Sequence, residues 1–98
     1  MRFEWDENKN RGNLAKHKVS FETASLVFDD PQALSVQDRV VEGEERWQTL
    51  GMISGIVVIV AHVYRDEVGA EVIRLISARK ATARERRAYA ESQERSSG

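Results

Sequence analysis

One stretch of the chain, residues 74–89, concentrates side chains that suit binding to a polyanion. Six basic residues stand between positions 74 and 87 against a single acid, Glu85. Guanidinium groups bind phosphate oxygens in pairs and keep their charge at any ordinary pH. The plainer interpretation, a solvated charged face of a helix, stays open beside this one. The basic residues are Arg74, Arg79, Lys80, Arg84, Arg86 and Arg87.

The local pattern predicts how this stretch is held. Residues 71–77 alternate as a strand does, which places Arg74 on the face opposite Ser77. Thr82 and Glu85 have the spacing of a capping box, which predicts a helix over residues 82–93. Arg79 and Lys80 fall on the connection between the two elements, where the pattern fixes no side-chain direction.

The remaining elements follow from hydrophobic periodicity and from capping or turn residues. Residues 55–64 are β-branched and apolar on both faces, so they are expected at the centre of a sheet. Residues 38–43 are polar and acidic and are expected to form a loop. The predicted elements are a strand at residues 2–5, helices at 6–17 and 21–28, strands at 33–36, 45–51, 56–64 and 71–77, and a helix at 82–93.

These elements predict an α+β fold of one domain. We expect an antiparallel sheet of four to five strands, with two helices before it in the sequence and one after it. Residues 1–93 form the expected domain, and residues 94–98, rich in serine and charge, form a tail that should fray.

Composition sets further bounds. The 98 residues carry a net charge of −1, but residues 22–45 hold seven acids and one base, so the surface has two poles. The chain has no cysteine, which excludes disulfides and thiolate chemistry. Its first residues form no apolar signal segment, and residues 55–64 are too few to cross a membrane. A cytoplasmic location is expected.

Several motifs, in order along nearly the whole chain, resemble those of BrnT-type toxins. The C-terminal signature is Ile-Ser-Ala-Arg-Lys-Ala-Thr at residues 76–82, followed by Glu85, Arg86 and Tyr89. One departure is Lys18, where the family pattern has glycine; a positive φ there would strain lysine by roughly 1 kcal/mol. The other matching segments are residues 3–6, 13–17, 19–22, 27–31 and 44–47.

The resemblance implies a RelE-like fold and a ribonuclease that needs no metal or other cofactor. In such a reaction the 2′-hydroxyl of the RNA attacks the adjacent phosphate, which requires proton transfer and cations for the added negative charge. The resemblance also implies a BrnA-like, ribbon-helix-helix antitoxin that is dimeric and forms a hetero-oligomer with the toxin. The alternative is a non-catalytic module that binds RNA or protein through the same basic residues.

Candidate residues for the reaction come from the positions that match the family motifs. As phosphate and transition-state contacts we nominate Arg46, Arg74, Arg79 and Lys80. Glu85 is a candidate base, although its capping position already gives it a structural task, and Glu45 is the other carboxylate option. The residues predicted to bind substrate are Lys16, His17, Arg84, Arg86 and Tyr89.

Two of these candidates have a structural alternative, and so does His62, the other histidine, whose side chain titrates near neutral pH when unperturbed. His17 could instead fix the end of its helix, and Tyr89 is expected more readily in the core than stacked on a base. His62, in the middle of the central strand, is more often structural at such a position. No metal site is expected, because the acidic pairs Asp29-Asp30 and Glu44-Glu45 diverge on regular elements.

Overall fold

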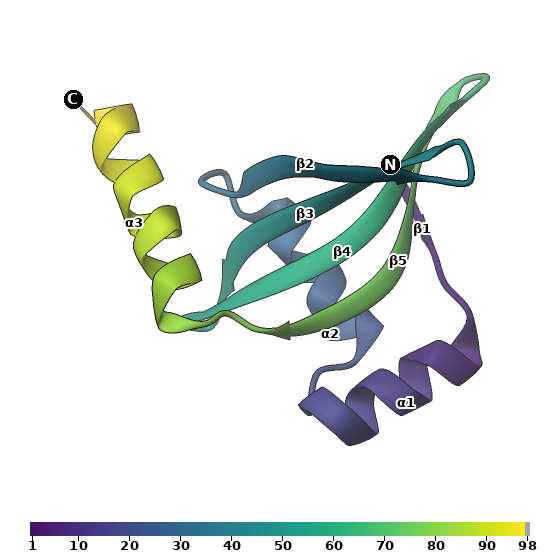
Figure 1. Ribbon diagram of the computed structural model, residues 1–98, viewed down its shortest axis with the longest axis horizontal. Helices are drawn as coiled ribbons and strands as arrows, with labels where there is room; N and C mark the ends of the chain where they lie inside the picture. The colour runs from purple at the N-terminus through teal and green to yellow at the C-terminus, as the bar shows by residue number, and fades with distance from the viewer. Residues whose placement is uncertain (98) are drawn as a thin grey trace.

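The computed structural model describes the backbone of residues 1–97 and the side chains of residues 1–94. The described chain forms one five-stranded sheet in the order β1-β5-β4-β3-β2, together with α-helices and one 3₁₀ helix (Figure 1). In chain order the elements are β1 (Arg2–Glu4), α1 (Glu7–His17), α2 (Phe21–Ala24), the 3₁₀ helix η1 (Ser25–Asp29), β2 (Leu34–Val41), β3 (Glu44–Ile53), β4 (Ile56–Glu67), β5 (Ala70–Lys80) and α3 (Ala83–Ser97).

The predicted α+β class and the central position of residues 55–64 are confirmed. β4 is the third of the five strands, and it pairs antiparallel with both β3 and β5. Between β3 and β4 the chain turns at Ser54 and Gly55, with φ of 50° and 82°. Positive φ at both central residues gives the tight two-residue hairpin that matches strand twist.

β1 is the exception to the predicted antiparallel sheet, because it runs parallel to β5. Phe3 of β1 lies opposite Ile73 of β5 and packs against the core cluster that includes it. The three residues of β1 carry no sequence signal for direction, since their partner strand is about seventy residues away in the chain.

The loop predicted at residues 38–43 is wrong. β2 continues to Val41, and the chain turns only at Glu42 and Gly43, both with positive φ. The register between β2 and β3 shifts between Gln37 and Arg39, which is a β-bulge at Asp38. The bulge absorbs one polar residue without ending the strand, so acidic composition gives a misleading loop signal here.

The predicted end of the last strand is also wrong. β5 runs to Lys80, so Arg79 and Lys80 belong to the strand and not to the connection after it. In β5, Ser77 pairs with Ala61 while Leu75 pairs with His62, which leaves Ile76 as an extra, bulged residue. The bulge reverses the alternation, so Arg74 and Ser77 share a face, contrary to the prediction from strict alternation.

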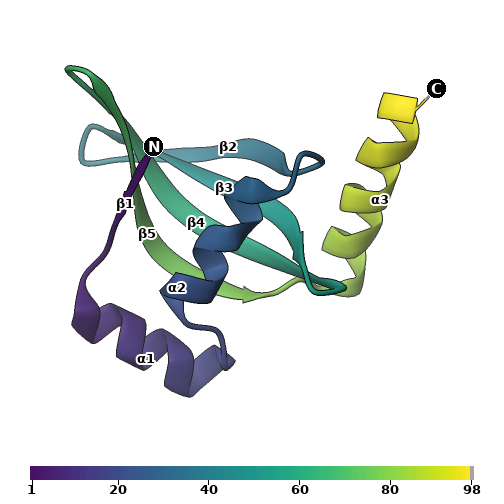
Figure 2. The ribbon, with the colours of Figure 1, turned by 180° about the vertical axis from the view of Figure 1, so that it is seen from behind.

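The helix predicted at residues 21–28 is shorter than expected, because α2 ends at Ala24 and continues as η1. These two elements cover one face of the sheet, which we call the helix-covered face, and α1 lies beside β5 below them (Figure 2). The core of this face includes Phe21, Val27 and Val60, none of them solvent-exposed. η1 approaches β3 closely at Gly51, where an added Cβ would lie 2.6 Å from Cβ of Val27.

α1 is attached through two buried asparagines. The Asn13 amide donates to the carbonyl oxygens of Val19 and Ala78, both at 2.8 Å, and accepts from the Ala78 amide at 3.1 Å. Asn10 accepts from the Phe21 amide at 2.8 Å. These residues are poor helix formers, and their hydrogen bonds explain why a helix of low intrinsic propensity is stable here.

The first two α-helices each begin at a side-chain cap. Asp6 accepts from the amides of Asn8 and Lys9 at the start of α1, and Ser20 accepts from Thr23 at the start of α2. Lys18 ends α1 in the left-handed conformation with φ of 62°. The positive φ that would strain a lysine at this position is therefore present.

α3 stands at one end of the opposite sheet face and leaves the rest of that face without a helix (Figure 1). It contacts the sheet through a second core cluster, in which Tyr89 packs with Leu50 and Ile59. α3 continues to Ser97, and Gly98, the last residue of the tail predicted to fray, lies outside the described residues. Among the described helices, none has the length and apolar character needed to cross a bilayer.

Candidate functional site

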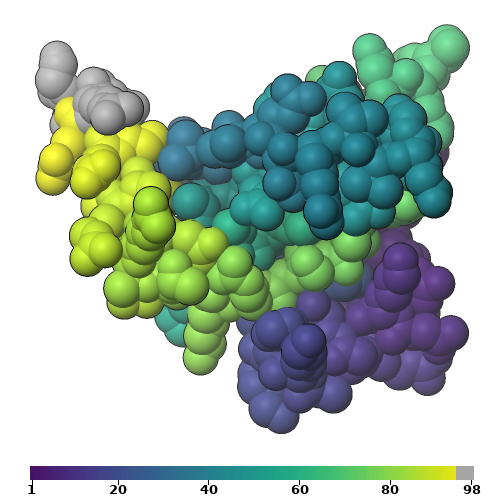
Figure 3. All heavy atoms as spheres, in the orientation of Figure 1, coloured from purple at the N-terminus to yellow at the C-terminus, as the bar shows by residue number. Residues whose placement is uncertain are grey.

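Three of the predicted phosphate contacts lie on one face of the sheet. Directly opposed residues on neighbouring antiparallel strands share a face. Arg46 and Arg74 both oppose Val63, one from β3 and the other from β5. Arg79 opposes Ile59, two residue pairs further along the same face of β4. We call this surface the arginine face; it is the face next to α3, and its solid surface is seen in Figure 3.

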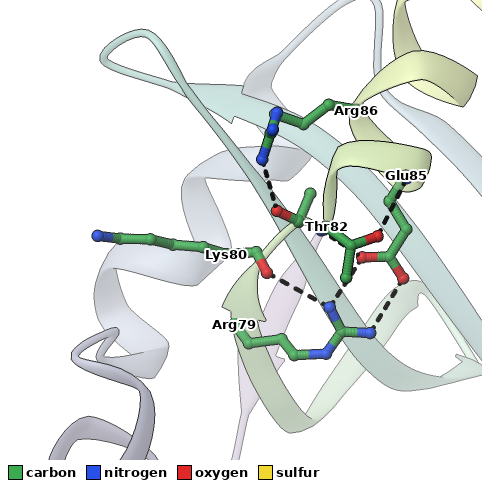
Figure 4. Close-up of polar contacts among 6 residues, drawn as sticks. Arg79, Lys80, Thr82, Glu85 and Arg86 are labelled. Carbon is green, nitrogen blue, oxygen red and sulfur yellow. Dashed lines mark hydrogen bonds and ion pairs between the residues drawn. The ribbon is translucent and has the colours of Figure 1, made fainter.

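At one end of the arginine face, Arg79 is held by the capping box of α3. Its guanidinium donates two hydrogen bonds to the Glu85 carboxylate, at 2.8 and 3.0 Å. Glu85 also accepts from the Thr82 amide at 2.8 Å, and the Thr82 hydroxyl accepts from the Glu85 amide at 3.2 Å, which confirms the predicted capping box. Figure 4 shows these three side chains together. The helix cap therefore also orients a guanidinium.

The same contacts set the protonation of the pair. Hydrogen bonds from Arg79 lower the pKa of Glu85 to about 2, and the bond to Glu85 raises the pKa of Arg79. A carboxylate with so low a pKa is ionised at neutral pH but is a weak base. The geometry thus favours Glu85 as the residue that positions Arg79 over Glu85 as a proton acceptor.

At the other end of the arginine face, basic residues are placed side by side. Arg39 of β2 lies opposite Arg46 of β3, and like charges in this position destabilise a sheet. The Nε of Arg46 is buried and has no hydrogen-bond partner within the described part of the chain. The nearest carboxylate to Arg74 belongs to Glu44, at 3.6 Å. A bound anion would relieve both the repulsion between Arg39 and Arg46 and the unsatisfied Nε of Arg46.

Lys80 and two further candidates lie elsewhere. Because Arg79 and Lys80 are consecutive in β5, their side chains take opposite faces, and Figure 4 shows Lys80 directed away from the Arg79–Glu85 pair. Lys16 and His17 are at the end of α1, which is attached to β5 at the backbone of Ala78. The structure therefore does not bring Lys80, Lys16 or His17 to the arginines.

The candidates on α3 differ in their surroundings. Arg84 and Arg86 are exposed on the first turn of the helix, and Arg86 donates to the Ala81 carbonyl oxygen at 3.1 Å. Tyr89 is buried, and its hydroxyl donates to Asp30 at 2.5 Å. This contact and burial raise the pKa of Tyr89 to about 12. Tyr89 takes the core position that the sequence favours for it.

His62 and Glu45 are on the helix-covered face, away from the arginines. The His62 ring is buried against Phe28, and its Nε2 lies 2.8 Å from the Thr49 hydroxyl. Burial lowers the pKa of His62 to about 4, so the ring is neutral at neutral pH. The structural interpretation of this histidine agrees with its surroundings. Among the described residues, no three His, Asp or Glu side chains gather as metal ligands would.

Two residues near the site, Arg39 and Asp30, are not among the candidates that the sequence suggests. Arg39 joins the arginine face only because β2 continues through the predicted loop; its β-branched neighbours Val40 and Val41 are the signal that could have revealed this strand. Asp30 accepts hydrogen bonds from Met52, Gln32 and Tyr89. It therefore connects α3 to the end of β3. No sequence pattern marks this carboxylate as a junction.

Taken together, the fold and the site define a small α+β protein whose open sheet face carries three arginines, one of which is held by a helix cap. Residues 5–85 match the profile of a family described as ribonuclease toxin, BrnT, of type II toxin–antitoxin system. The chain belongs to this family, so it is a ribonuclease toxin whose partners are an RNA substrate and a protein antitoxin. A comparison with curated protein sequences gives no significant match.

Proposed function

We propose that the chain cleaves RNA on the arginine face, without a metal, through attack of the 2′-hydroxyl on the adjacent phosphate. The observation that carries the proposal is the shared face of Arg46, Arg74 and Arg79 in a chain of the BrnT family. As the 2′-oxygen attacks, the phosphate gains negative charge. Guanidinium groups already in place stabilise that charge without having to reorganise.

The three arginines divide this task by position. Arg46 and Arg74 are separated by one strand, so their backbones are about 10 Å apart. Each side chain is long enough to reach toward the surface between them, above Val63. Arg79 lies further along the face, where it contacts the same RNA strand. The cationic surface is extended on either side by Arg39, Arg84 and Arg86. These residues contact phosphates of the RNA backbone, and such contacts weaken as salt is added.

Glu85 acts on the reaction through Arg79. Two hydrogen bonds fix the plane of the guanidinium, and the carboxylate is fixed in turn by the Thr82 amide. A fixed plane lowers the entropy that Arg79 loses when it binds a phosphate oxygen. Lysine would replace Arg79 only in part, because an ammonium group keeps the positive charge but has no planar pair of donors.

The proposed antitoxin is a dimeric ribbon-helix-helix protein of the BrnA type that shields the basic residues in a hetero-oligomer. Its complementary charge would make association fast and dependent on salt. Both proteins would act in the cytoplasm, where the RNA substrate is found.

The test is to identify the chemical ends that the purified chain leaves on a defined RNA in excess EDTA. Attack by the 2′-hydroxyl leaves a 2′,3′-cyclic phosphate and a 5′-hydroxyl, and a 2′-deoxynucleotide at the cleaved position should abolish the products. Products with 5′-phosphate ends that disappear in EDTA would contradict the proposal. Salt-sensitive binding without any cleavage would favour a non-catalytic RNA-binding module.

A further inference from the structure

A groove lies on the opposite side of the molecule from the arginine face, between the end of α1 and the β3–β4 hairpin. It has a volume of about 320 Å³. Figure 2 shows this side of the molecule, with α2 in front of the sheet and α1 below it. The floor includes Ile53 and Val58, and two apolar side chains on the margin, Leu14 and Ile56, are 48% and 47% exposed. Exposed apolar side chains around an apolar floor are typical of a protein contact.

The rim of the groove is cationic. Lys18 and Lys80 both line it, and none of its lining residues is acidic. Lys80 reaches this side because it is the last residue of β5 and points away from Arg79 (Figure 4). The groove therefore suits an apolar side chain with carboxylates beside it.

Lys18 occupies the rim against its backbone preference. It caps α1 with φ of 62° and ψ of 25°, a conformation that glycine adopts without strain and lysine does not. Among the described residues, the Lys18 ammonium has one hydrogen-bond partner, the exposed carbonyl oxygen of Ala15 at 3.2 Å. This contact does not compensate the strain, so the structure gives the side chain no internal reason to be lysine.

We infer that this groove is a docking site for the antitoxin, which inserts an apolar side chain flanked by Asp or Glu. The inference rests on the proposed function only in taking the antitoxin as the partner. RNA is the weaker occupant, because none of the lining residues is aromatic and single-stranded RNA is bound largely by stacking on aromatic rings. The contact would be separate from the arginine face, so one antitoxin chain would hold the toxin on both sides.

The experiment measures antitoxin affinity and RNA cleavage on the same set of full-length toxin variants. Leu14→Asp and Ile56→Asp place a carboxylate in the groove, where it would repel the antitoxin acids and lose the apolar contact. We expect each to weaken antitoxin binding at least tenfold and to leave RNA cleavage and the melting temperature within twofold and a few degrees of the parent. Val68→Asp is the matched control, since Val68 is a fully exposed apolar residue in the turn after β4.

Lys18→Gly gives an independent readout. Glycine relieves the positive-φ strain, so the melting temperature should rise, while antitoxin binding should weaken and lose part of its salt dependence. A structural role for Lys18 would lower stability and leave affinity unchanged.

Three results would overturn the inference: groove variants that bind the antitoxin as tightly as the parent, an equal loss in Val68→Asp, or a loss of RNA cleavage in place of antitoxin binding. A parent chain that binds no antitoxin would overturn it too. If the parent cleaves no RNA but the groove variants still release the antitoxin, the proposed cleavage fails and the docking site stands.

Discussion

At the scale of single residues, burial and hydrogen bonding separate side chains that the sequence alone treats as equivalent candidates. His62 and Glu85 both carry titratable side chains, and only Glu85 falls at a position that matches the family motifs. The ring of His62 is neutral in the core, whereas Glu85 is ionised and paired with Arg79. The two residues are therefore tested by different measurements, His62 by the pH dependence of stability and Glu85 by RNA cleavage.

Because His62 is buried in its neutral form, we expect the protein to lose stability in mild acid. Its pKa falls from 6.5 to about 4 on folding, so between these values the unfolded chain binds the proton and the folded chain does not. Stability is complete above pH 6.5 and falls as the pH drops toward 4, by about 3 kcal/mol in total. Denaturant unfolding at pH 7 and at pH 4.5 measures the difference.

His62→Gln is the control for this pH dependence, because glutamine can still reach the Thr49 hydroxyl but does not titrate. The difference in unfolding free energy between the two pH values should shrink by most of the His62 contribution. An unchanged pH dependence in this variant would mean that other groups cause the loss.

Glu85→Gln tests whether the carboxylate positions Arg79 or accepts a proton. Glutamine keeps a capping side chain, so the unfolding free energy should change by no more than about 1 kcal/mol. RNA cleavage should fall, because the two-bond contact to the guanidinium is lost. In an Arg79→Ala background the same substitution should have no further effect, as expected for two residues that act as one unit.

A further loss of cleavage in the double variant would contradict this account of Glu85. It would show that the carboxylate has a task in the reaction independent of Arg79, such as accepting the proton of the 2′-hydroxyl.

At the scale of elements, two bulges explain much of what the sequence does not reveal. The bulge at Asp38 lets β2 continue through an acidic segment, and the bulge at Ile76 brings Arg74 onto the face of Arg79. Alternation predicts β3 and β4 correctly because both are regular over their full pairing. A bulge is set by strand pairing, which local periodicity does not record, so the arginine face could not be assembled from sequence alone.

Asn13 tests the attachment of α1 to the sheet. Asn13→Ala removes three buried hydrogen bonds and leaves the partner groups of Val19 and Ala78 unsatisfied, which should cost roughly 1–3 kcal/mol of unfolding free energy. Asn8→Ala is the control in the same helix, since Asn8 is exposed and should change stability by less than about 0.5 kcal/mol. Equal effects in urea unfolding would show that α1 is held in some other way.

At the scale of the whole molecule, the sheet separates two surfaces. The arginine face is open apart from α3, while the other face is covered by α2 and η1 and carries the lysine-rimmed groove. Net charge of −1 conceals this division. The sequence predicts the basic residues of the site, and the family they indicate, but the fold decides which of them face the same way.

The most direct test of the account is the single-turnover rate of RNA cleavage by the parent, Arg74→Ala and Arg79→Ala, with melting curves on the same preparations. Arg11→Ala is the matched control, an exposed arginine on α1. The account predicts a loss of roughly 100-fold or more for each arginine-face variant, with a nearly unchanged melting temperature, partial rescue by Arg79→Lys, and a parental rate for Arg11→Ala. Losses that match lost folding, or an equal loss in Arg11→Ala, would contradict it.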